Sequence, residues 1–477
     1  MFATRTELMP HQATAVAKLL PSRVGAAFMD MGTGKSRTLI ELAKIRQDKW
    51  DRLFWFTPCA LRENVHEQVL LHTDLTDADI EIWDNKALDR GIRDVRVHIV
   101  GIESMSSSDR VVFAYARMIT EKSYVVVDES SYIKGHSSQR TQRITAMSEK
   151  CRYRTILTGT PLTQGAVDLY AQMKFLSPKI LGYRSFWSFS SAHLEYEYRK
   201  TASGRKRNTG RILRSHNEDY LAAKIAPYTY QVRKDECLDL PGKLYSRRYT
   251  TMTEAQRDLY EETKHDILSM DYDDWSPIRI FHLFASLQSI VCGFLGSPGG
   301  AFVEVPHNRI SLLIATVAEI PDTEKVIIWA KYHHAVQQIC DALSAAYGAD
   351  SVCPYYGGQS SDDREKSLRR WRAGARFLVA TQSIGGHGLT LTEASYTIFY
   401  ADSFKYSERI QSEDRTHRIG QTRRPVYISL HCSKSIDDRI AKAIYCKGSV
   451  LRSFQRQVDV YRADGMRQKA IDLVRSL

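Results

Sequence analysis

Short apolar runs alternate with helix-like stretches along the first third of the chain. Strands that lie between two layers of helices are apolar throughout, and polar or turn residues end each run. This alternation predicts a parallel, doubly wound α/β sheet, whose ligands bind at the carboxyl ends of the strands. The predicted strands are 24–28, 52–58, 95–105, 124–127 and 154–157.

A second block of the same kind begins near Pro306, with predicted strands at 325–330, 351–358, 376–382, 396–402 and 425–432. It lacks a glycine-rich phosphate loop, so we expect no second nucleotide site. Between the blocks, the stretch 296–300 predicts a hinge or linker. The sequence therefore predicts a first lobe at 1–180 and a second lobe at 305–448. Between them lies a helical and basic insertion and linker at 181–304, in which 232–243 packs back on the first lobe. A helical tail at 449–477 follows and packs across the lobes.

The stretch MDMGTGKS, which begins at Met29, joins the first predicted strand to a helix-like pattern. Gly32 and Gly34 have no Cβ, so their backbone N–H groups can curl around a polyphosphate. The helix that begins near Lys35 adds unsatisfied N–H groups, while the Lys35 ammonium can reach the β- and γ-phosphates and the Ser36 hydroxyl can ligate Mg²⁺. Met29 stands where the strict pattern has its first glycine. The alternative is an ordinary glycine-rich turn, which the flanking strand and helix disfavour.

Asp128 and Glu129 follow the valines of the fourth predicted strand. A carboxylate at a strand end can hold Mg²⁺, and its neighbour can orient or deprotonate the attacking water. By itself the pattern also fits a strand that ends in a solvated acidic turn. The phosphate loop earlier in the same predicted sheet favours the catalytic interpretation, with ATP and Mg²⁺ as cofactors.

The stretch QSEDRTHRIGQ, residues 411–421, contains two arginines. Arg415 and Arg418 are about one helical turn apart, so on a helix they would point at the same anion. Arginines brought from another element stabilise a transferring γ-phosphoryl group, by about 10³- to 10⁵-fold in rate. An amphipathic helix with surface arginines is the alternative, and in isolation the favoured one. Because these arginines lie in a separate lobe from the phosphate loop, they predict a cleft that closes on ATP.

The chain of 477 residues carries 67 Lys and Arg against 55 Asp and Glu, a net charge of +12. This excess favours a polyanionic partner, either nucleic acid or an anionic membrane. The eight cysteines form no C-x-x-C pair, so neither a zinc site nor a disulfide framework is indicated. No apolar run approaches about 18 residues, and the first residues lack a signal-peptide pattern. The sequence therefore predicts a cytosolic or nuclear protein.

The region 183–220 combines aromatic residues with a run, 199–214, of seven basic residues and no acidic residue. The run is either a solvated loop or a surface that contacts the phosphate backbone. The aromatic residues Phe186, Trp187 and Phe189 fit a structural helix better than a base-stacking surface, because a protein that tracks a duplex meets no exposed base faces.

Taken together, these motifs resemble the Snf-two family, the chromatin-remodeller-type ATPases among the superfamily-two helicase-like motors. The resemblance covers roughly residues 6 to 445 and implies two RecA-like P-loop NTPase lobes, each an α/β lobe with a parallel, doubly wound sheet, and helical insertions. Ser130 and Ser131 replace the usual Ala-His of the acidic motif, and His387 and Thr390 are unusual within motif V. The matching segments are LMPHQ, MDMGTGKS, TPCAL, GIES, DESS, LTGTPL, VRKDECLDLPGK, KVIIWAKYHHAVQQI, YYGGQSSDDREKSLRRW, SIGGHGLTLTEA and DRTHRIGQ.

The resemblance implies a role for each matching position. The nucleotide is bound by Gln12, which reads adenine, and by Gly32, Thr33, Gly34, Lys35, Ser36 and Arg37. Catalysis falls to Lys35, Asp128, Glu129, Gln411, Arg415 and Arg418, with Ser36 and Asp128 on Mg²⁺. Thr158 and Thr160 relay the nucleotide state. Hydroxyl and N–H groups bind phosphate without reading sequence, and the segments that touch the DNA backbone contain Thr57, Pro58, Gly101, Ser104, Thr381 and Thr392, to which the basic run adds Arg205, Lys206 and Arg207.

These residues predict an enzyme, a DNA-stimulated ATPase that translocates on double-stranded DNA by cyclic closure of its lobes and releases ADP and phosphate. The expected partner is duplex DNA, including branched or single-stranded junctions, for a monomeric motor that uses no membrane. One alternative is a strand-separating or annealing helicase of the same superfamily, with a hairpin inside 183–220 as its wedge. The other is an ATP-gated DNA clamp or scaffold, which has no need of Glu129 or of both arginines. No further module is recognisable, so we expect a minimal bacterial or phage motor in the cytoplasm, or a nuclear one in a eukaryote.

Neutralising Arg205, Lys206 and Arg207 together tests whether the basic run contacts phosphate. Each lost phosphate contact removes one released counterion, so we expect weaker DNA binding and a shallower dependence of the affinity on salt, by about one unit of log–log slope per contact. The measurement is a DNA titration at several salt concentrations. An unchanged slope would assign the run to a solvated loop.

Overall fold

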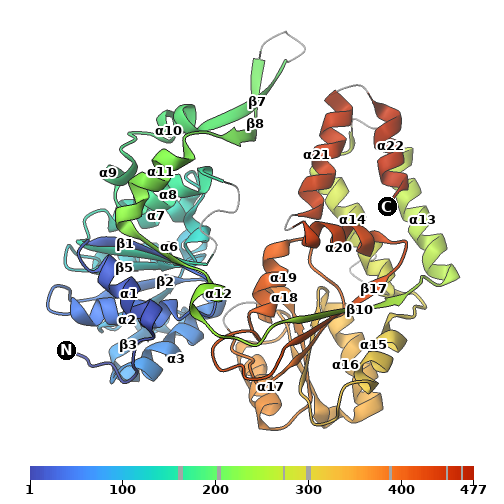
Figure 1. Cartoon of the computed structure of the whole chain (residues 1–477), viewed down its shortest axis with the longest axis horizontal. Helices are drawn as coiled ribbons and strands as arrows, with labels where there is room; N and C mark the ends of the chain where they lie inside the picture. Colours follow the sequence, from blue (N-terminus) through green and yellow to red (C-terminus); the bar gives the residue numbers. More distant parts are fainter. Residues whose placement is uncertain are drawn as a thin grey trace. The chain divides into compact units, whose positions relative to one another are not determined.

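The computed structural model describes residues 1–159, 165–200, 206–271, 274–296, 302–385, 389–446, 449–463 and 466–477. The chain forms two compact units, Met1–Asp239 and Leu240–Leu477 (Figure 1). Each unit has its own parallel sheet with helices, as the sequence predicts. The boundary differs from the predicted division, because the predicted insertion 181–304 is shared. Residues up to Asp239 pack within the first unit, and those from Leu240 pack within the second.

The first unit contains a seven-stranded sheet in the order β3-β4-β2-β5-β6-β1-β9, in which every neighbouring pair is parallel. The five predicted strands of the first block are confirmed, and β3 and β9 extend the sheet at its two edges. Because the strands are parallel, their carboxyl ends meet at one edge. The strands are β1 Val24–Met29, β2 Leu53–Thr57, β3 Ile80–Ile82, β4 Val97–Gly101, β5 Tyr124–Asp128, β6 Tyr153–Thr158 and β9 Thr229–Val232.

Helices cover both faces of this sheet (Figure 1). Along β2, Phe54 and Phe56 pack into one helical layer, and Leu53 and Trp55 pack into the other. Both faces are therefore apolar, which explains the continuous apolar runs of the sequence. One layer contains α1 Pro10–Leu19, α2 Lys35–Ile45 and α3 Arg62–His72, and the other contains α4 Asn85–Arg90, α5 Ser104–Ser107, α6 Asp109–Met118, α7 Gln139–Ser148, α8 Val167–Leu176, α9 Pro178–Leu181, α10 Phe186–His193 and α11 Glu218–Ile225.

A two-stranded hairpin extends from α10 away from the first sheet (Figure 1). It consists of β7 Leu194–Lys200 and β8 Lys206–Ser215, which pair antiparallel. The described residues of the basic run, 199–200 and 206–214, therefore lie on these two strands. Residues 201–205 of the run, which include Arg205, lie outside the described residues, as does Thr160.

The second unit contains a six-stranded parallel sheet in the order β10-β17-β16-β13-β15-β14. The five predicted strands of the second block are confirmed, and β10 adds an edge strand from the segment that was expected to belong to the insertion. The elements are β10 Leu244–Thr250, β13 Val326–Ala330, β14 Val352–Tyr355, β15 Phe377–Thr381, β16 Tyr396–Phe399 and β17 Val426–Cys432, with α15 Arg309–Ala318, α16 His333–Tyr347, α17 Ser361–Ala373, α18 Gln382–Gly385 and α19 Tyr406–Glu413.

A separate helical core completes the second unit. Its helices are α13 Glu254–Ser269, α14 Pro277–Val291, α20 Ile436–Tyr445, α21 Val450–Ala463 and α22 Arg467–Arg475. The predicted tail therefore packs on α13 and α14 within this unit, because its apolar residues share their core. Of the predicted hinge or linker at 296–300, residues 297–300 lie outside the described residues. The strands β11 Phe294–Gly296 and β12 Phe302–Glu304 pair antiparallel within the second unit. Within the described parts, no helix combines the length and apolarity that a membrane crossing needs.

A buried ion pair joins the helical core to the second sheet. Arg309, at the start of α15, donates to Asp437 at the start of α20, and both side chains are buried. Asp437 also accepts from the backbone N–H of Cys432 at 3.0 Å, and Arg309 donates to the carbonyl oxygen of Tyr400 at 2.5 Å. Removal of one partner leaves the other charge buried without compensation.

Asp437→Ala should lower the free energy of unfolding by about 3–5 kcal/mol, because it strands the Arg309 guanidinium in the core. The control is Glu365→Ala, which removes the exposed partner of Arg369 on α17 and should cost less than about 1 kcal/mol. Urea unfolding followed by circular dichroism measures both values. Equal losses in the two variants would contradict the prediction.

Candidate nucleotide and nucleic-acid site

The predicted phosphate loop joins β1 to α2 in the first unit. Gly32 and Gly34 have positive φ angles of 78° and 84°, a region that favours glycine. A Cβ on Gly34 would lie 2.0 Å from Nε2 of Gln12, so a side chain does not fit there. Gly34 is also the N-cap residue of α2, and it has no side chain that could accept from the first N–H groups of the helix. The first N–H groups of α2 therefore form the kind of helix terminus that binds an anion.

Lys35 is the first residue of α2, and its side chain folds over the loop. Its Nζ donates to the carbonyl oxygens of Met29 at 3.0 Å and Asp30 at 3.2 Å. Thr33 closes the same turn, since its hydroxyl donates to the carbonyl oxygen of Asp30 at 2.7 Å. Ser36 follows in the first helical turn and is half-buried. The loop thus has the lysine and hydroxyl in the order that phosphate and cation binding require.

The first turn of α1 contacts the phosphate loop through hydrogen bonds. Gln12 donates through Nε2 to the carbonyl oxygen of Thr33 at 3.2 Å and accepts at Oε1 from the N–H of Met9 at 3.0 Å. The ring of His11 lies 2.8 Å from the same Thr33 oxygen. Gln12 therefore holds the loop in this structure, and its adenine contact stays a prediction.

Arg37, which was predicted to bind the nucleotide, has another set of partners. Its buried guanidinium donates to the hydroxyl of Thr6 at 2.9 Å, to the carbonyl oxygen of Thr6 at 2.6 Å and to the carboxylate of Glu41 at 2.8 Å. These bonds tie α2 to the segment before α1. Each guanidinium nitrogen of Arg37 thus has a protein partner in this structure, and its nucleotide contact stays a prediction.

The acidic pair lies at the carboxyl end of β5, beside the loop. Burial raises the pKa of Asp128 to about 6; the charge of Glu129 adds to the rise, and the Lys35 ammonium opposes it. Glu129 has a left-handed backbone, with φ 47° and ψ 57°. Few residues other than glycine adopt this conformation, and strain of this kind is concentrated at functional sites.

Neighbouring elements hold the strained turn in place. Ser130 is buried, and its hydroxyl donates to Oε1 of Gln172 on α8 at 2.6 Å. The hydroxyl of Thr158, at the end of β6, lies 3.5 Å from a carboxylate oxygen of Glu129. Sequence reasoning missed Gln172, whose one signal was a buried amide among the mostly apolar residues of α8.

The donor set of this edge fits Mg²⁺ with ATP. Asp128 offers a desolvated carboxylate and Ser36 a hydroxyl, and oxygen ligands of this kind suit Mg²⁺. Within the ranges that the structure describes, no three His, Cys, Asp or Glu side chains form a metal cluster. A cation held here would take its other ligands from phosphates and water, which is how Mg²⁺ usually binds beside nucleotides.

The two predicted arginines lie in the second unit, and one expectation about them is wrong. Helix α19 ends at Glu413, so Arg415 and Arg418 lie in the turns that follow it and not on a helical face. They nevertheless converge, because Nη1 of each donates to the carbonyl oxygen of Leu389 at 3.2 Å. Arg415 also donates through Nε to the carbonyl oxygen of Gln411 at 2.9 Å. Burial and the charge of Arg415 lower the pKa of Arg418 to about 10.

A buried carboxylate anchors the arginine segment. Glu413 accepts from Lys243 at 2.8 Å, from the Tyr245 hydroxyl at 2.8 Å and from Arg409 at 2.9 Å. Burial alone would raise the pKa of Glu413, but Lys243 and Arg409 hold it below its usual value. The ring of His417 lies 3.1 Å from the carbonyl oxygen of Pro241. The segment that carries both arginines is thereby fixed to the sheet of the second unit.

The predicted DNA-contact residues of the first unit meet at the same sheet edge. Pro58 follows β2 and Gly101 ends the neighbouring strand β4, and a Cβ on Gly101 would lie 2.3 Å from the Sγ of Cys59. The hydroxyl of Ser104 lies 3.7 Å from this sulfur. Thr57 differs from the expectation, because its hydroxyl is buried without a hydrogen-bond partner. The DNA contact of this segment stays a prediction.

The remaining residues that were predicted to contact DNA differ in their burial. Thr381 ends β15 and has a buried hydroxyl without a hydrogen-bond partner, like Thr57 in the first unit. Thr392 is half-buried beside the arginine segment, and a Cβ on Gly420 would lie 3.7 Å from its hydroxyl. Lys206 and Arg207 lie on β8, where only their backbone is described. These DNA contacts stay predictions.

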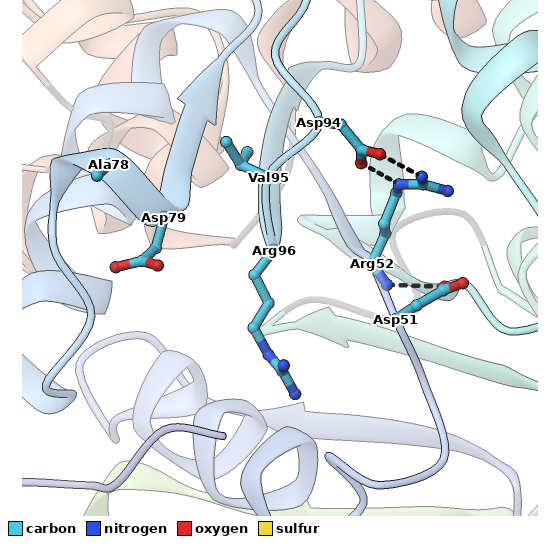
Figure 2. A pocket seen from close by; sticks show the side chains of 7 residues that line it. All are labelled: Asp51, Arg52, Ala78, Asp79, Asp94, Val95 and Arg96. Atoms are coloured by element: carbon cyan, nitrogen blue, oxygen red, sulfur yellow. Dashed lines mark hydrogen bonds and ion pairs between the residues drawn. The ribbon is translucent and has the colours of Figure 1, made fainter.

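An open cavity of 410 Å³ lies at the opposite edge of the first sheet (Figure 2). Its lining residues precede β2, β3 and β4, so it faces the amino ends of the strands. Figure 2 shows Arg52 and Asp94 turned toward each other, paired at 2.5 and 2.7 Å. The charges of Arg52 and Asp94 therefore neutralise each other. Because the cavity faces the amino ends of the strands, it is not part of the nucleotide site, which lies at their carboxyl ends.

Two family models match the chain. The SNF2-related domain matches residues 55–292, and the helicase conserved C-terminal domain matches residues 308–420. A solved structure, the Sulfolobus solfataricus SWI2/SNF2 ATPase core in complex with dsDNA, is 20% identical, covers 98% of this chain and 97% of its own, and has a TM-score of 0.41.

Curated relatives carry related names. The Arabidopsis thaliana ATP-dependent DNA helicase DDM1 is 26% identical, over 68% of this chain and 44% of its own length. The Mus musculus DNA annealing helicase and endonuclease ZRANB3 is 24% identical, over 87% of this chain and 38% of its own. An uncharacterized ATP-dependent helicase of Mycoplasma pneumoniae is 23% identical, over 71% of this chain and 31% of its own. The chain thus spans less than half the length of these relatives.

Glu129→Gln tests the role of the strained acidic residue. The amide keeps the size of the side chain but cannot accept a proton, so we expect ATP binding to persist while turnover falls at least about 100-fold. Binding is measured with a fluorescent ATP analogue and turnover by phosphate release. The control is Glu121→Gln, an exposed glutamate of the same unit, which should keep full activity. Full turnover in Glu129→Gln would show that the base lies elsewhere.

Proposed function

The chain belongs to the SNF2-related family, and from this premise we propose that it is an ATP-dependent motor that translocates on double-stranded DNA and hydrolyses ATP to ADP and phosphate. The observation that carries the proposal is the division of catalytic groups between two compact units. The loop and the acidic pair belong to the first unit, and the two convergent arginines belong to the second. Hydrolysis then requires the units to act together.

In the proposed reaction, residues of the first unit bind ATP and prepare the water. The N–H groups of the loop and of α2 hold the phosphates, with Lys35 at the β- and γ-phosphates. Asp128 and Ser36 would hold Mg²⁺, which supplies charge neutralisation between the phosphates. Glu129 accepts the proton of the attacking water, and its left-handed backbone, stabilised through Ser130, fixes the direction of its carboxylate.

The second unit supplies the charge that the transition state needs. Arg415 and Arg418 both donate to one carbonyl oxygen, so their guanidinium groups already point to a common position. On closure of the two units over ATP, these groups turn from the Leu389 oxygen to the γ-phosphate, whose negative charge accepts stronger, charge-assisted hydrogen bonds. Opening after phosphate release completes one step.

DNA enters this cycle through the backbone groups at the sheet edges. The segments with Pro58, Gly101 and Ser104 meet at the sheet edge that carries the acidic pair. DNA phosphates bound there would lie close to the catalytic residues. Contacts through N–H and hydroxyl groups hold any sequence equally well. The net charge of +12 supports a polyanionic track.

Two other functions make different use of the same site. A strand-separating motor is favoured by the β7–β8 hairpin, which extends from the first unit as a wedge would (Figure 1). An ATP-gated clamp would bind DNA and ATP without turnover, and the strained Glu129 and the paired arginines argue against it. Triplex displacement detects translocation on a duplex, and a forked substrate detects strand separation.

Duplex DNA should raise the rate of ATP turnover in this protein, and Arg415→Ala should abolish that rise. The variant removes charge at the γ-phosphate, so we expect DNA-stimulated turnover to fall by about 10³-fold or more while ATP binding stays within a few-fold. Phosphate release with and without duplex measures the effect. Arg423→Ala, which removes an exposed guanidinium paired with Glu324, is the matched control. Turnover that ignores DNA would refute the motor.

A further inference from the structure

A row of aromatic rings reaches the surface of the first unit beside α8 and α10. His136, in the segment before α7, stacks on Phe186 with ring centroids 3.6 Å apart and planes at 11°. Trp187 follows, with its ring 6.1 Å from that of Phe186. Tyr170 lies beneath, 5.4 Å from Phe186 and 6.5 Å from His136. The stacked pair and the tryptophan form what we call the aromatic platform, defined by His136, Phe186 and Trp187.

The tryptophan of this platform is unlike every other tryptophan of the chain. Trp187 is 71% exposed, whereas the other six are at most 4% exposed. Burial of the indole is worth about 1.5–3 kcal/mol or more in a core, so folding alone does not explain its place on the surface. Phe189 on the same helix is fully buried, which confirms the predicted structural role of α10 and separates Trp187 from it.

The surroundings of the platform are basic. Lys174 on α8 is exposed, its Nζ lies 6.0 Å from the centre of the Tyr170 ring, and its charge reaches His136. Arg184, just before α10, is also exposed. Within the described part of the chain, neither Lys174 nor Arg184 forms an ion pair with a carboxylate. A polyanion fits such a surface better than an apolar protein face does.

The platform also continues the edge that we expect to carry DNA. It borders α7, and Arg143 of α7 donates to the carbonyl oxygen of Met105 on α5 at 3.0 Å. Helix α5 begins at Ser104, one of the predicted phosphate contacts. Helices α7, α8 and α10 lie in one layer of the unit (Figure 1). The platform and the predicted phosphate contact at Ser104 are thus linked through α7 within one helical layer.

We propose that the aromatic platform binds unpaired bases of DNA, which stack on Trp187 and on the His136–Phe186 pair while Lys174 contacts their phosphates. The proposal rests on DNA being the track of the proposed motor, and it adds a single-stranded or branched segment to the substrate. Base faces are closed inside a duplex but open in a single strand, and aromatic side chains bind them with little sequence preference. The inference replaces the expectation that this region has no stacking role.

Tryptophan fluorescence tests the platform directly, because Trp187 is the exposed indole. The full chain is titrated with an oligothymidylate, with a strand of equal length that consists of abasic sites, and with a blunt duplex. We expect the oligothymidylate to quench the exposed emission and the abasic strand to leave it unchanged, since stacking needs a base. Equal responses to the two strands would overturn the proposal.

Variants separate stacking from general binding. Trp187→Ala should weaken oligothymidylate affinity about 10-fold, measured by anisotropy of a labelled strand, and Trp187→Phe should retain most of it because phenyl rings also stack. Leu71→Ala, at a residue 57% exposed on the opposite helical layer, should change nothing. Wild-type affinity in Trp187→Ala would overturn the proposal and leave the platform to a protein partner.

The same samples distinguish this inference from the proposed function. Duplex-stimulated ATP turnover should be unchanged in Trp187→Ala, because the platform does not contact the nucleotide residues. Lost single-strand affinity with intact duplex stimulation supports the inference. Should duplex fail to stimulate the wild type, the motor is refuted, while the fluorescence titration still decides the platform by itself.

Discussion

The charge of the buried Asp128 carboxylate is the constraint on which the first unit depends. A buried anion has to be compensated, and here the compensation comes from Lys35 of the phosphate loop, against the repulsion of Glu129. Strand β5 delivers the acid and the β1–α2 turn delivers the lysine, so the charges meet only if both strands belong to one parallel sheet. The left-handed backbone of Glu129 carries a further cost, and the bond from Ser130 to Gln172 helps to offset it. Fold and site therefore stabilise each other.

The sequence predicts most of the fold and the first half of the site, because both depend on local signals. Apolar runs such as 124–127 identify buried strands, and MDMGTGKS specifies its own turn through glycine backbone freedom. What it does not predict depends on tertiary contacts. Arg415 and Arg418 keep helical spacing yet lie beyond the end of α19, since the buried Glu413 network determines where that segment runs. Edge strands β9 and β10 pair with strands distant in sequence, and the bonds of Arg37 to Thr6 and Glu41 likewise have no local signal.

Tertiary contacts hold the connection between the two units at both of its ends. At its first end, the N–H of Lys234 donates to the carboxylate of Asp30 in the phosphate loop at 2.9 Å. At its other end, Lys243 pairs with Glu413, and the carbonyl oxygen of Pro241 contacts His417 of the arginine segment. Each end is thus bonded, within its own unit, to a segment of the candidate site. A displacement of the loop or of the arginine segment acts on the connection directly, and this makes it a mechanical element in the proposed motor.

The candidate residues of the first unit and those of the second unit have electrostatics of opposite sign. In the first unit, burial and, after it, the charge of Glu129 raise the pKa of Asp128, and a bound cation would relieve this. In the second unit, burial and, after it, the charge of Arg415 lower the pKa of Arg418, and a bound anion would relieve this. A nucleotide with its metal carries a cation and an anion in one ligand. In the proposed motor, it lowers the free energy of Asp128 and of Arg418 together only when the residues of both units contact it. In the proposed cycle, this shared relief favours closure before hydrolysis, and loss of the γ-phosphate removes the anionic part and permits opening.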